Sequence, residues 1–278
     1  MEVVAHTDVG AFVRVARPLL DADPVRHTIA LTALDAVCRG ALEPAVLLTV
    51  HAGGGLTGVV LRVEGWPLML SALPAGHAVA VEAAVDAADP EVTAANGPVA
   101  EVEAFAAART ARTGASVQVV MRERLFRLGT LTPPSEVAGV PRPAGGHDLD
   151  LLVEWNVAFA AEAVSALRPP SDPRPHLRDA LAQGGPMLWE VDGRPVAYAV
   201  ARPPVAGMSR IGPVYTPPAH RRHGYGAAVT AAAARRALDR GVRHVALFTD
   251  LANPTTNRLY PRLGFEPVLD ALEVRFGG

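Results

Sequence analysis

The sequence contains no lysine and only one cysteine, Cys38. All 26 residues of the Lys and Arg total are therefore arginines. A P-loop needs the lysine of its GxxxxGK motif and Schiff-base enzymes need a lysine amine, so both classes are excluded. One cysteine cannot form an intramolecular disulfide, a CxxC motif or a cysteine zinc cluster, and this fits a reducing, cytoplasmic location.

The sequence also has neither a large net charge nor a long apolar run. The formal net charge is −2, so we expect no nucleic-acid and no membrane partner, although a local basic site stays open. No apolar run reaches the roughly 18 residues of a membrane span, and the N-terminus lacks a basic-then-apolar leader, so we expect no membrane helix and no signal peptide. Half of the 278 residues are hydrophobic, which is ample for the packed cores of one large domain or two smaller ones.

A stretch rich in proline and glycine divides the chain near its middle. Residues 132–147 carry no periodic apolar pattern and predict a linker between domains at 1–131 and 148–278. In the first part we predict strands within 45–52, 56–65, 66–73 and 116–128, and helices near 9–21, 25–39, 75–88 and 98–112.

The second part has a similar rhythm. We predict helices at 148–166, 174–183, 225–240 and 254–263, with strands at 187–193, 194–203, 210–216, 244–250 and 266–276. The sequence therefore predicts an α+β fold of two similar lobes, although no stretch of identity links the two halves. Each lobe is expected to be a mostly antiparallel mixed sheet flanked by helices.

The stretch "HRRHGYGA", residues 220–227, lies between a predicted strand and a predicted helix. A helix N-terminus leaves backbone N–H groups without partners and carries partial positive charge, so a phosphate placed there satisfies both. Gly224 and Gly226 let the backbone approach a ligand closely, and Arg221 and Arg222 add positive charge. The pattern lacks the third glycine of a dinucleotide-binding fingerprint, which disfavours nucleotide or NAD binding. A tight strand-to-helix turn without a ligand is the simpler interpretation of a GxG pair alone.

Residues 221–226 fit R-x-x-G-x-G, which resembles the acyl-CoA pyrophosphate loop of the GCN5-related N-acetyltransferase (GNAT) family. The resemblance extends to "VYTPPAHRRHGYG" and "ALFTDLANPTTNRLYPRLGFEPV" and covers residues 187–276 well and 148–186 loosely. It implies an acetyl-CoA-dependent transfer of an acetyl group to a primary amine. Three acceptors stay open, a small-molecule amine, a peptide N-terminus and a protein lysine, and nothing in the sequence chooses among them.

The resemblance also implies roles for particular residues. A splayed strand would pair with the pantetheine arm, the loop would hold the pyrophosphate, and an Asn-rich turn would contact the cofactor. These positions are Val214, Tyr215 and Thr216 on the strand, Arg221, Arg222, His223, Gly224, Tyr225, Gly226 and Ala227 in the loop, and Asn253 and Asn257 in the turn. Asn253 precedes a proline, so helix capping is an alternative role for it. His220 and His223 have no further ligands nearby, and we expect no metal site.

Two candidate catalytic residues follow from the same resemblance. Tyr260 matches the tyrosine that protonates the departing CoA thiolate, and a phenol is a plausible proton donor to sulfur. Its alternative role is packing of its helix on the sheet. Glu162 lies on the helix that the family places beside the acceptor, which makes it a candidate general base, whereas most such carboxylates are simply solvated. A water chain is the alternative base.

The first 131 residues contain no R-x-x-G-x-G, and their Gly-rich stretch "HAGGGLTG" predicts a hairpin turn. This arrangement resembles tandem members of the family with a degenerate N-terminal lobe. Such a lobe would enclose the acceptor pocket, stabilise the fold or select the substrate. A non-catalytic acyl-CoA-binding or regulatory module remains the alternative function, and a homodimer is possible.

Overall fold

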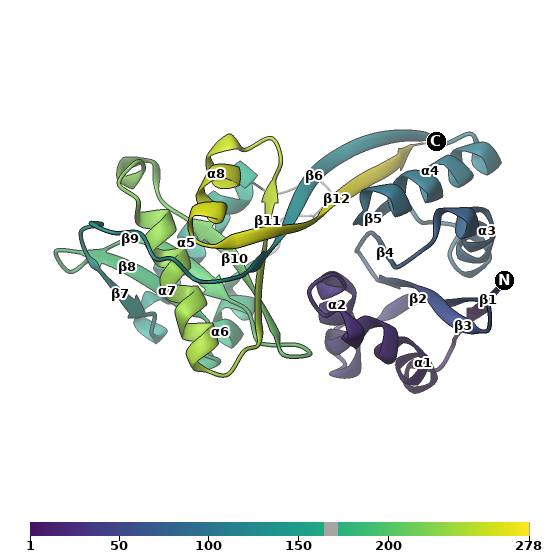
Figure 1. The fold of residues 1–278 in the computed structure, drawn as a ribbon, viewed down its shortest axis with the longest axis horizontal. Helices are drawn as coiled ribbons and strands as arrows, with labels where there is room; N and C mark the ends of the chain where they lie inside the picture. The colour runs from purple at the N-terminus through teal and green to yellow at the C-terminus, as the bar shows by residue number, and fades with distance from the viewer. Residues whose placement is uncertain (164–171, 278) are drawn as a thin grey trace. The chain divides into compact units, whose positions relative to one another are not determined.

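The computed structural model describes residues 1–163 and 172–277. They form two compact units (Figure 1). The first comprises Met1–Glu123 together with the last strand from Leu269 onward, and the second comprises Arg124–Val268. Each unit combines helices with a mixed sheet, which confirms the predicted fold class. No helix within these described residues is long and apolar enough to cross a membrane.

The first unit follows the order β-α-α-β-β-β-α-β-α-β. Its elements are β1 (Glu2–Ala5), α1 (Val9–Ala22), α2 (Thr28–Cys38), β2 (Pro44–Ala52), β3 (Gly55–Val63), β4 (Leu68–Ser71), α3 (Ala78–Ala88), β5 (Ala94–Pro98), α4 (Val99–Thr113) and β6 (Ser116–Leu128). The predicted helices and hairpin strands are all present. The short strand β5 was not expected, because Asn96, Gly97 and Pro98 have the composition of a turn. This segment is a strand because it pairs with two neighbours, parallel with β4 and antiparallel with β12.

The second unit repeats the same order of elements. They are β7 (Val140–Pro143), α5 (Leu149–Ala163), α6 (Arg174–Ala182), β8 (Pro186–Val191), β9 (Arg194–Ala201), β10 (Met208–Tyr215), α7 (Tyr225–Asp239), β11 (His244–Asp250), α8 (Pro254–Arg262) and β12 (Phe265–Gly277). Residues 164–166, predicted to continue α5, lie outside the described residues. Within the predicted linker 132–147, residues 140–143 form β7, which pairs antiparallel with β8. That segment is thus part of the second unit's sheet.

Each unit takes one strand from the other half of the sequence. The sheet order is β1-β2-β3-β4-β5-β12 in the first unit and β6-β11-β10-β9-β8-β7 in the second. Strand β12 pairs antiparallel with β5 from Ala271↔Pro98 to Arg275↔Ala94. The last residues of β6, from Arg124 onward, belong to the second unit. The compact units therefore differ from the domains 1–131 and 148–278 expected from the sequence.

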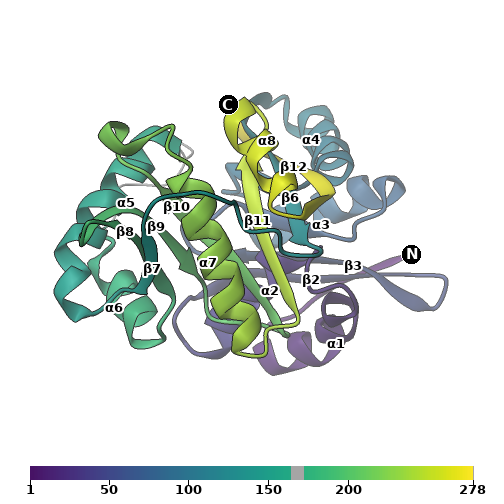
Figure 2. The same ribbon diagram turned by 60° about the vertical axis from the view of Figure 1, so that its left-hand side comes forward.

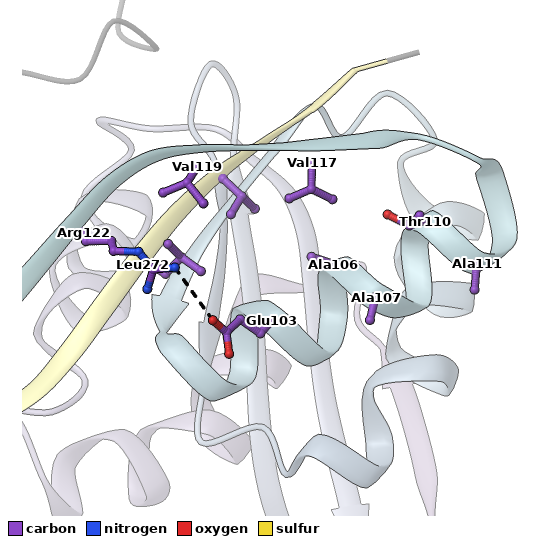
Figure 3. A pocket seen from close by; sticks show the side chains of 10 residues that line it. Glu103, Ala106, Ala107, Thr110, Ala111, Val117, Val119, Arg122 and Leu272 are labelled. Atoms are coloured by element: carbon purple, nitrogen blue, oxygen red, sulfur yellow. Dashed lines mark ion pairs between the residues drawn. The ribbon is translucent and has the colours of Figure 1, made fainter.

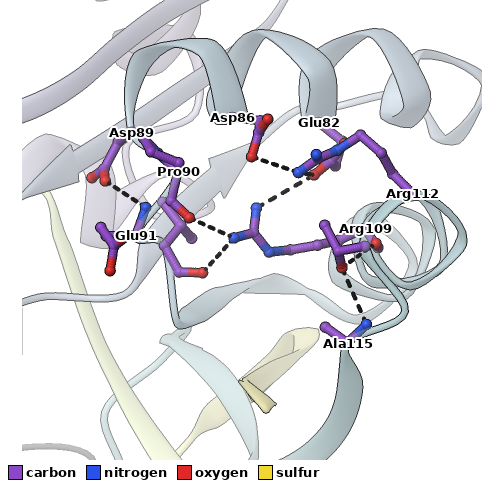
Figure 4. Close-up of polar contacts among 10 residues, drawn as sticks. Glu82, Asp86, Asp89, Pro90, Glu91, Arg109, Arg112 and Ala115 are labelled. Carbon is purple, nitrogen blue, oxygen red and sulfur yellow. Dashed lines mark hydrogen bonds and ion pairs between the residues drawn. The ribbon is translucent and has the colours of Figure 1, made fainter. Parts of the chain in front are cut away.

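A buried polar network joins α3 to α4 in the first unit (Figure 4). Glu82 is almost completely buried and accepts hydrogen bonds from Arg109 at 3.3 Å and from Arg112 at 2.6 and 2.8 Å. Arg109 also donates to the carbonyl oxygens of Pro90 and Val92, and its guanidinium lies 5.3 Å from the ring centre of Phe276. Since each buried charged group has charged or hydrogen-bonding partners, the network fixes both helices without leaving an isolated buried charge.

The core of the second unit is divided by its sheet. Helix α7 packs across β8, β9 and β10 (Figure 2) through its alanine-rich face, which includes Ala231, Ala233, Ala234 and Ala237. Alanine is the best helix former and lets the helix approach the sheet closely. A separate cluster packs α5 against β9 and β10 through Trp155, Tyr198 and Tyr215.

Candidate active site

Strands β10 and β11 pair over only part of their length. Their parallel register covers Met208↔His244, Ser209↔Val245 and Arg210↔Ala246, although β11 continues to Asp250. Beyond Arg210, β10 stays beside β9, with a register shift between Ile211 and Val214. The facing edges of residues 211–215 and 247–250 thus carry no ladder pairing with each other. This is the splayed strand arrangement expected around Val214, Tyr215 and Thr216.

A short loop joins β10 to α7 and exposes a series of backbone amides. Gly224 is the N-cap of α7 with φ +81°, and Arg222 has φ +68°. The amide of Ala228 donates to the Gly224 carbonyl oxygen at 3.0 Å, but the amides of residues 222–227 have no acceptor among the described residues. A run of unpaired N–H groups at a helix N-terminus is an anion-binding arrangement.

The two glycines of this loop serve different physical purposes. Gly224 has a left-handed φ, and a Cβ there would lie 3.0 Å from a methyl carbon of Val137. Gly226 has an ordinary φ. A Cβ built on it would have the Thr216 hydroxyl oxygen as its nearest neighbour, at 3.4 Å. Gly224 is therefore needed for the turn itself, whereas Gly226 mainly keeps side-chain atoms away from the first turn of α7.

The side chain of Arg221 turns back toward the protein. Its Nε donates to the Thr216 carbonyl oxygen at 2.9 Å, and its Nη2 donates to the two carboxylate oxygens of Glu162 at 2.6 and 2.9 Å. The guanidinium also lies 5.8 Å from the ring centre of Tyr215. The remaining loop side chains have other surroundings: Arg222 is exposed, and the His223 ring stacks on Tyr225 with centres 5.4 Å apart.

Glu162 is thereby joined to the loop by an ion pair and hydrogen bonds. It accepts from Arg221 and, at 3.3 Å, from the hydroxyl of Tyr215. Burial, followed by the nearby Glu162 charge, raises the pKa of the Tyr215 phenol, so this hydroxyl stays a donor. The Glu162 and Arg221 side chains are 45% and 43% exposed. An ion pair with this much solvent exposure contributes only about 0.2–1 kcal/mol to the stability of the fold. This contact between α5 and the loop was not predicted, because its partners are far apart in sequence.

Tyr260 lies on the buried face of α8. Its ring is 6% exposed and packs against Phe126 and Phe265, with centres 6.3 and 5.9 Å away. Burial raises its pKa to about 12, and its hydroxyl makes no hydrogen bond within the described residues. The phenol is therefore protonated at physiological pH but is a weaker acid than an ordinary tyrosine. The packing role and the acid role are both compatible with this position.

The two asparagines differ in their contacts. The Oδ1 of Asn253 accepts from the amides of Thr255 and Thr256 at 3.1 and 3.3 Å, so Asn253 caps α8. The Nδ2 of Asn257 donates to the carbonyl oxygens of Asp250 and Asn253, both at 2.8 Å. Its Oδ1 is buried and has no partner. A buried acceptor without a donor is costly, so Asn257 is the better candidate for contact with a ligand.

The loop lies within a part of the chain that resembles a known family. Residues 152–265 match the profile of the Acetyltransferase (GNAT) family. Residues 152–265 form a GNAT domain. None of the curated proteins matches the sequence.

Solved structures share the fold over nearly the whole chain. A GCN5-related N-acetyltransferase from Kribbella flavida is 23% identical, with a TM-score of 0.59 and coverage of 90% of this chain and 95% of that one. One from Sphaerobacter thermophilus is 17% identical, with a TM-score of 0.62 and coverage of 98% and 95%. A tandem GNAT protein from the clavulanic acid biosynthesis pathway is 15% identical, with a TM-score of 0.56 and coverage of 99% and 98%. The repeated order of elements thus matches a tandem GNAT fold.

The residues of the GNAT domain fit an acyl-CoA. The unpaired amides of 222–227 are suited to its pyrophosphate, the unpaired edge of β10 to its pantetheine amides, and the orphaned Oδ1 of Asn257 to one of its donors. Among the loop arginines, Arg222 is exposed, whereas Arg221 is engaged by Glu162.

The first unit differs from the GNAT domain at the position of Tyr260. Helices α4 and α8 are followed by Gly114 and Gly264, both at left-handed φ. Four residues before each glycine stand Thr110 and Tyr260 respectively, so the first unit has no equivalent phenol.

The turn after β4 is also closed by the first unit's own side chains. The Leu73 amide in that turn donates at 3.0 Å to Glu101, a carboxylate that also binds Arg26 at 3.2 Å. A Cβ on Gly97 of β5 would lie only 2.7 Å from the Leu70 carbonyl oxygen, so β4 and β5 stay close where β10 and β11 separate.

Proposed function

We propose that this protein is an acyl-CoA-dependent N-acetyltransferase that transfers an acetyl group from acetyl-CoA to a primary amine. The observation that carries the proposal is the run of unpaired amides at residues 222–227, next to the edge where β10 and β11 separate. The proposal extends the GNAT assignment of the second half to an activity and a donor.

The roles of the side chains follow from their contacts. When bound, acetyl-CoA supplies the activated acyl thioester. The amides of residues 222–227 and the exposed Arg222 hold the pyrophosphate, and Asn257 accepts a hydrogen bond through its free Oδ1. Tyr260 donates its phenolic proton to the departing sulfur. Burial raises its pKa to about 12, so the phenol carries its proton at neutral pH and is available as a donor.

Glu162 keeps capacity for a further donor. Its oxygens accept three hydrogen bonds from Arg221 and Tyr215, and a carboxylate has about four acceptor sites, so an acceptor amine can approach it without displacing these donors. The amine reacts in its neutral form, and a water chain to solvent serves equally well for its deprotonation.

One observation favours the alternative, a module that binds acyl-CoA without turnover. The Tyr260 ring packs against the rings of Phe126 and Phe265, and its hydroxyl makes no hydrogen bond to another described residue. A tyrosine used only for packing has these surroundings. The two functions differ in whether free thiol appears.

The test is a titration of the purified protein with acetyl-CoA by calorimetry, followed by thiol release with a panel of amines. Gly226→Asp adds bulk and negative charge beside the unpaired amides and should abolish binding. Gly76→Asp is the matched control, because Gly76 lies in the corresponding turn of the first unit, with open space around it. Binding at one site per chain with thiol release supports the transferase, and binding without release on any amine supports the module. Wild-type affinity in Gly226→Asp contradicts both.

A further inference from the structure

The first unit contains a hollow between α4 and the strands β6 and β12 (Figure 3). Its volume is about 500 Å³, within the roughly 300–1,000 Å³ range of small-molecule sites. Its helix side is lined by small residues, including Ala106, Ala107 and Ala111, and its strand sides by valines and a leucine. The hollow lies apart from the GNAT domain, since every lining residue belongs to the first unit.

The second unit shows what fills the corresponding space there. Alignment of the two units on Gly114 and Gly264 places Thr110 opposite Tyr260 and Ala115 opposite Phe265. Tyr260 and Phe265 pack with ring centres 5.9 Å apart and are 6% and 2% exposed. The first unit has a threonine and an alanine at these two positions. Both positions thus carry smaller side chains in the first unit, and one of them, Thr110, lines the hollow.

The side chains around the hollow are apolar and partly uncovered. Val117 and Val119 of β6 are 42% and 48% exposed, whereas Leu272 and Val274 of β12 are 3% and 1% exposed. Protein interiors are normally close-packed, and an unfilled space forfeits dispersion contacts along its lining. An apolar guest that occupies the hollow would restore the contacts that the aromatic rings make in the second unit.

One end of the hollow carries a guanidinium with free donors. Arg122 is 48% exposed and its nearest acid is Glu103, at 3.9 Å, which is an ion-pair distance and not a hydrogen bond. Arg122 makes no hydrogen bond to another described residue. A guanidinium presents a planar set of donors that matches a carboxylate, and such charge-assisted bonds are stronger than neutral ones. The hydroxyl of Thr110, in contrast, already donates to the Ala115 carbonyl oxygen at 2.9 Å.

We propose that this hollow binds a medium-chain carboxylate of the fatty-acid type. The hydrocarbon chain lies between Ala107 of α4 and the valines of β6, and the carboxylate accepts hydrogen bonds from Arg122. The small volume and the flanking charge distinguish this ligand from a protein helix or strand, which needs a longer apolar face. The site does not depend on acyl-CoA binding by the second unit.

The test uses decanoate, with decanol and decylamine as uncharged and cationic probes of the same chain. Calorimetry on the wild-type protein should show saturable decanoate binding at one site. Arg122→Gln should weaken decanoate binding by about tenfold, the effect of losing a charge-assisted contact, and leave decanol binding unchanged. Ala107→Phe should abolish binding of both probes by filling the hollow. Arg14→Gln and Ala22→Phe, on the exposed surface of α1, are the matched controls and should bind as the wild type does.

Several outcomes overturn the proposal. These are no saturable binding of decanoate, equal loss of decanoate and decanol binding in Arg122→Gln, and unchanged decanoate binding in Ala107→Phe. Preferential binding of decylamine that Glu103→Gln removes would assign the site to a cation instead. A dimer in sedimentation equilibrium that Val117→Glu dissociates would show that a second copy of the chain covers the hollow.

Discussion

Replacing Phe276 by alanine is expected to destabilise the first unit, although Phe276 lies in the last strand of the sequence. The ring is 7% exposed, packs 6.1 Å from Phe105 and lies beneath the guanidinium of Arg109 at 5.3 Å. Truncation of a core phenylalanine costs roughly 3–5 kcal/mol, and the loss of its cation–π contact with the buried guanidinium of Arg109 adds to this cost. Since the ring sits near the end of β12, we expect a loss near the lower limit, about 3 kcal/mol.

Native-state hydrogen exchange is the suitable assay, because it reports stability region by region. A loss of about 3 kcal/mol should speed exchange in β5 and α4 by about two orders of magnitude. Val268→Ala is the matched control: it changes the same strand within the second unit, at a side chain that is 37% exposed, and should alter stability by less than about 0.5 kcal/mol. Faster exchange confined to α7 and β10 in Phe276→Ala, with β5 unchanged, would refute the reasoning.

The remaining predictions concern the GNAT domain. Tyr260→Phe should lower kcat with little change in acetyl-CoA affinity, and full turnover in the variant would return Tyr260 to a packing role. Burial raises the pKa of Tyr260 to about 12, above the unfolded value near 10, so its stabilising effect is present below about pH 10 and disappears toward pH 12. Urea unfolding across this range should show the wild type losing about 2–3 kcal/mol more than Tyr260→Phe, and parallel losses would contradict the assigned burial. Glu162→Gln should cost at most about 1 kcal/mol of stability yet change acetyl-CoA affinity by freeing Arg221, whereas Glu154→Gln, on the same helix, should change neither; calorimetry checks both. Asn253→Ala should cost about 1 kcal/mol as a lost helix cap, and an unchanged thermal midpoint would argue against capping.

The sequence contained enough local information to predict most elements and the anion-binding turn. The order strand, R-x-x-G-x-G and helix depends on residues that are adjacent in the chain, and the physical requirements at Gly224 and the N-terminus of α7 are local as well. The proposed cofactor residues from Val214 to Ala227 do lie together around the end of β10 and the start of α7. Whether they bind acetyl-CoA stays a prediction.

The long-range features could not be predicted, for two physical reasons. The contact between Arg221 and Glu162 joins residues that are 59 positions apart in the sequence, and no periodicity marks such a pair. The strand β5 has the composition of a turn and becomes a strand only through its pairing with β4 and β12. Tertiary pairing overrides local propensity at that position.

The exchange of strands also has a consequence for biosynthesis. A nascent chain that has left the ribosome as far as β6 contains every helix of the first unit but not β12, the neighbour of β5 in the finished sheet. Until that strand is synthesised, the outer edge of β5 offers unpaired backbone groups, which favour pairing with other chains. The first unit is therefore translated first and completes its sheet last.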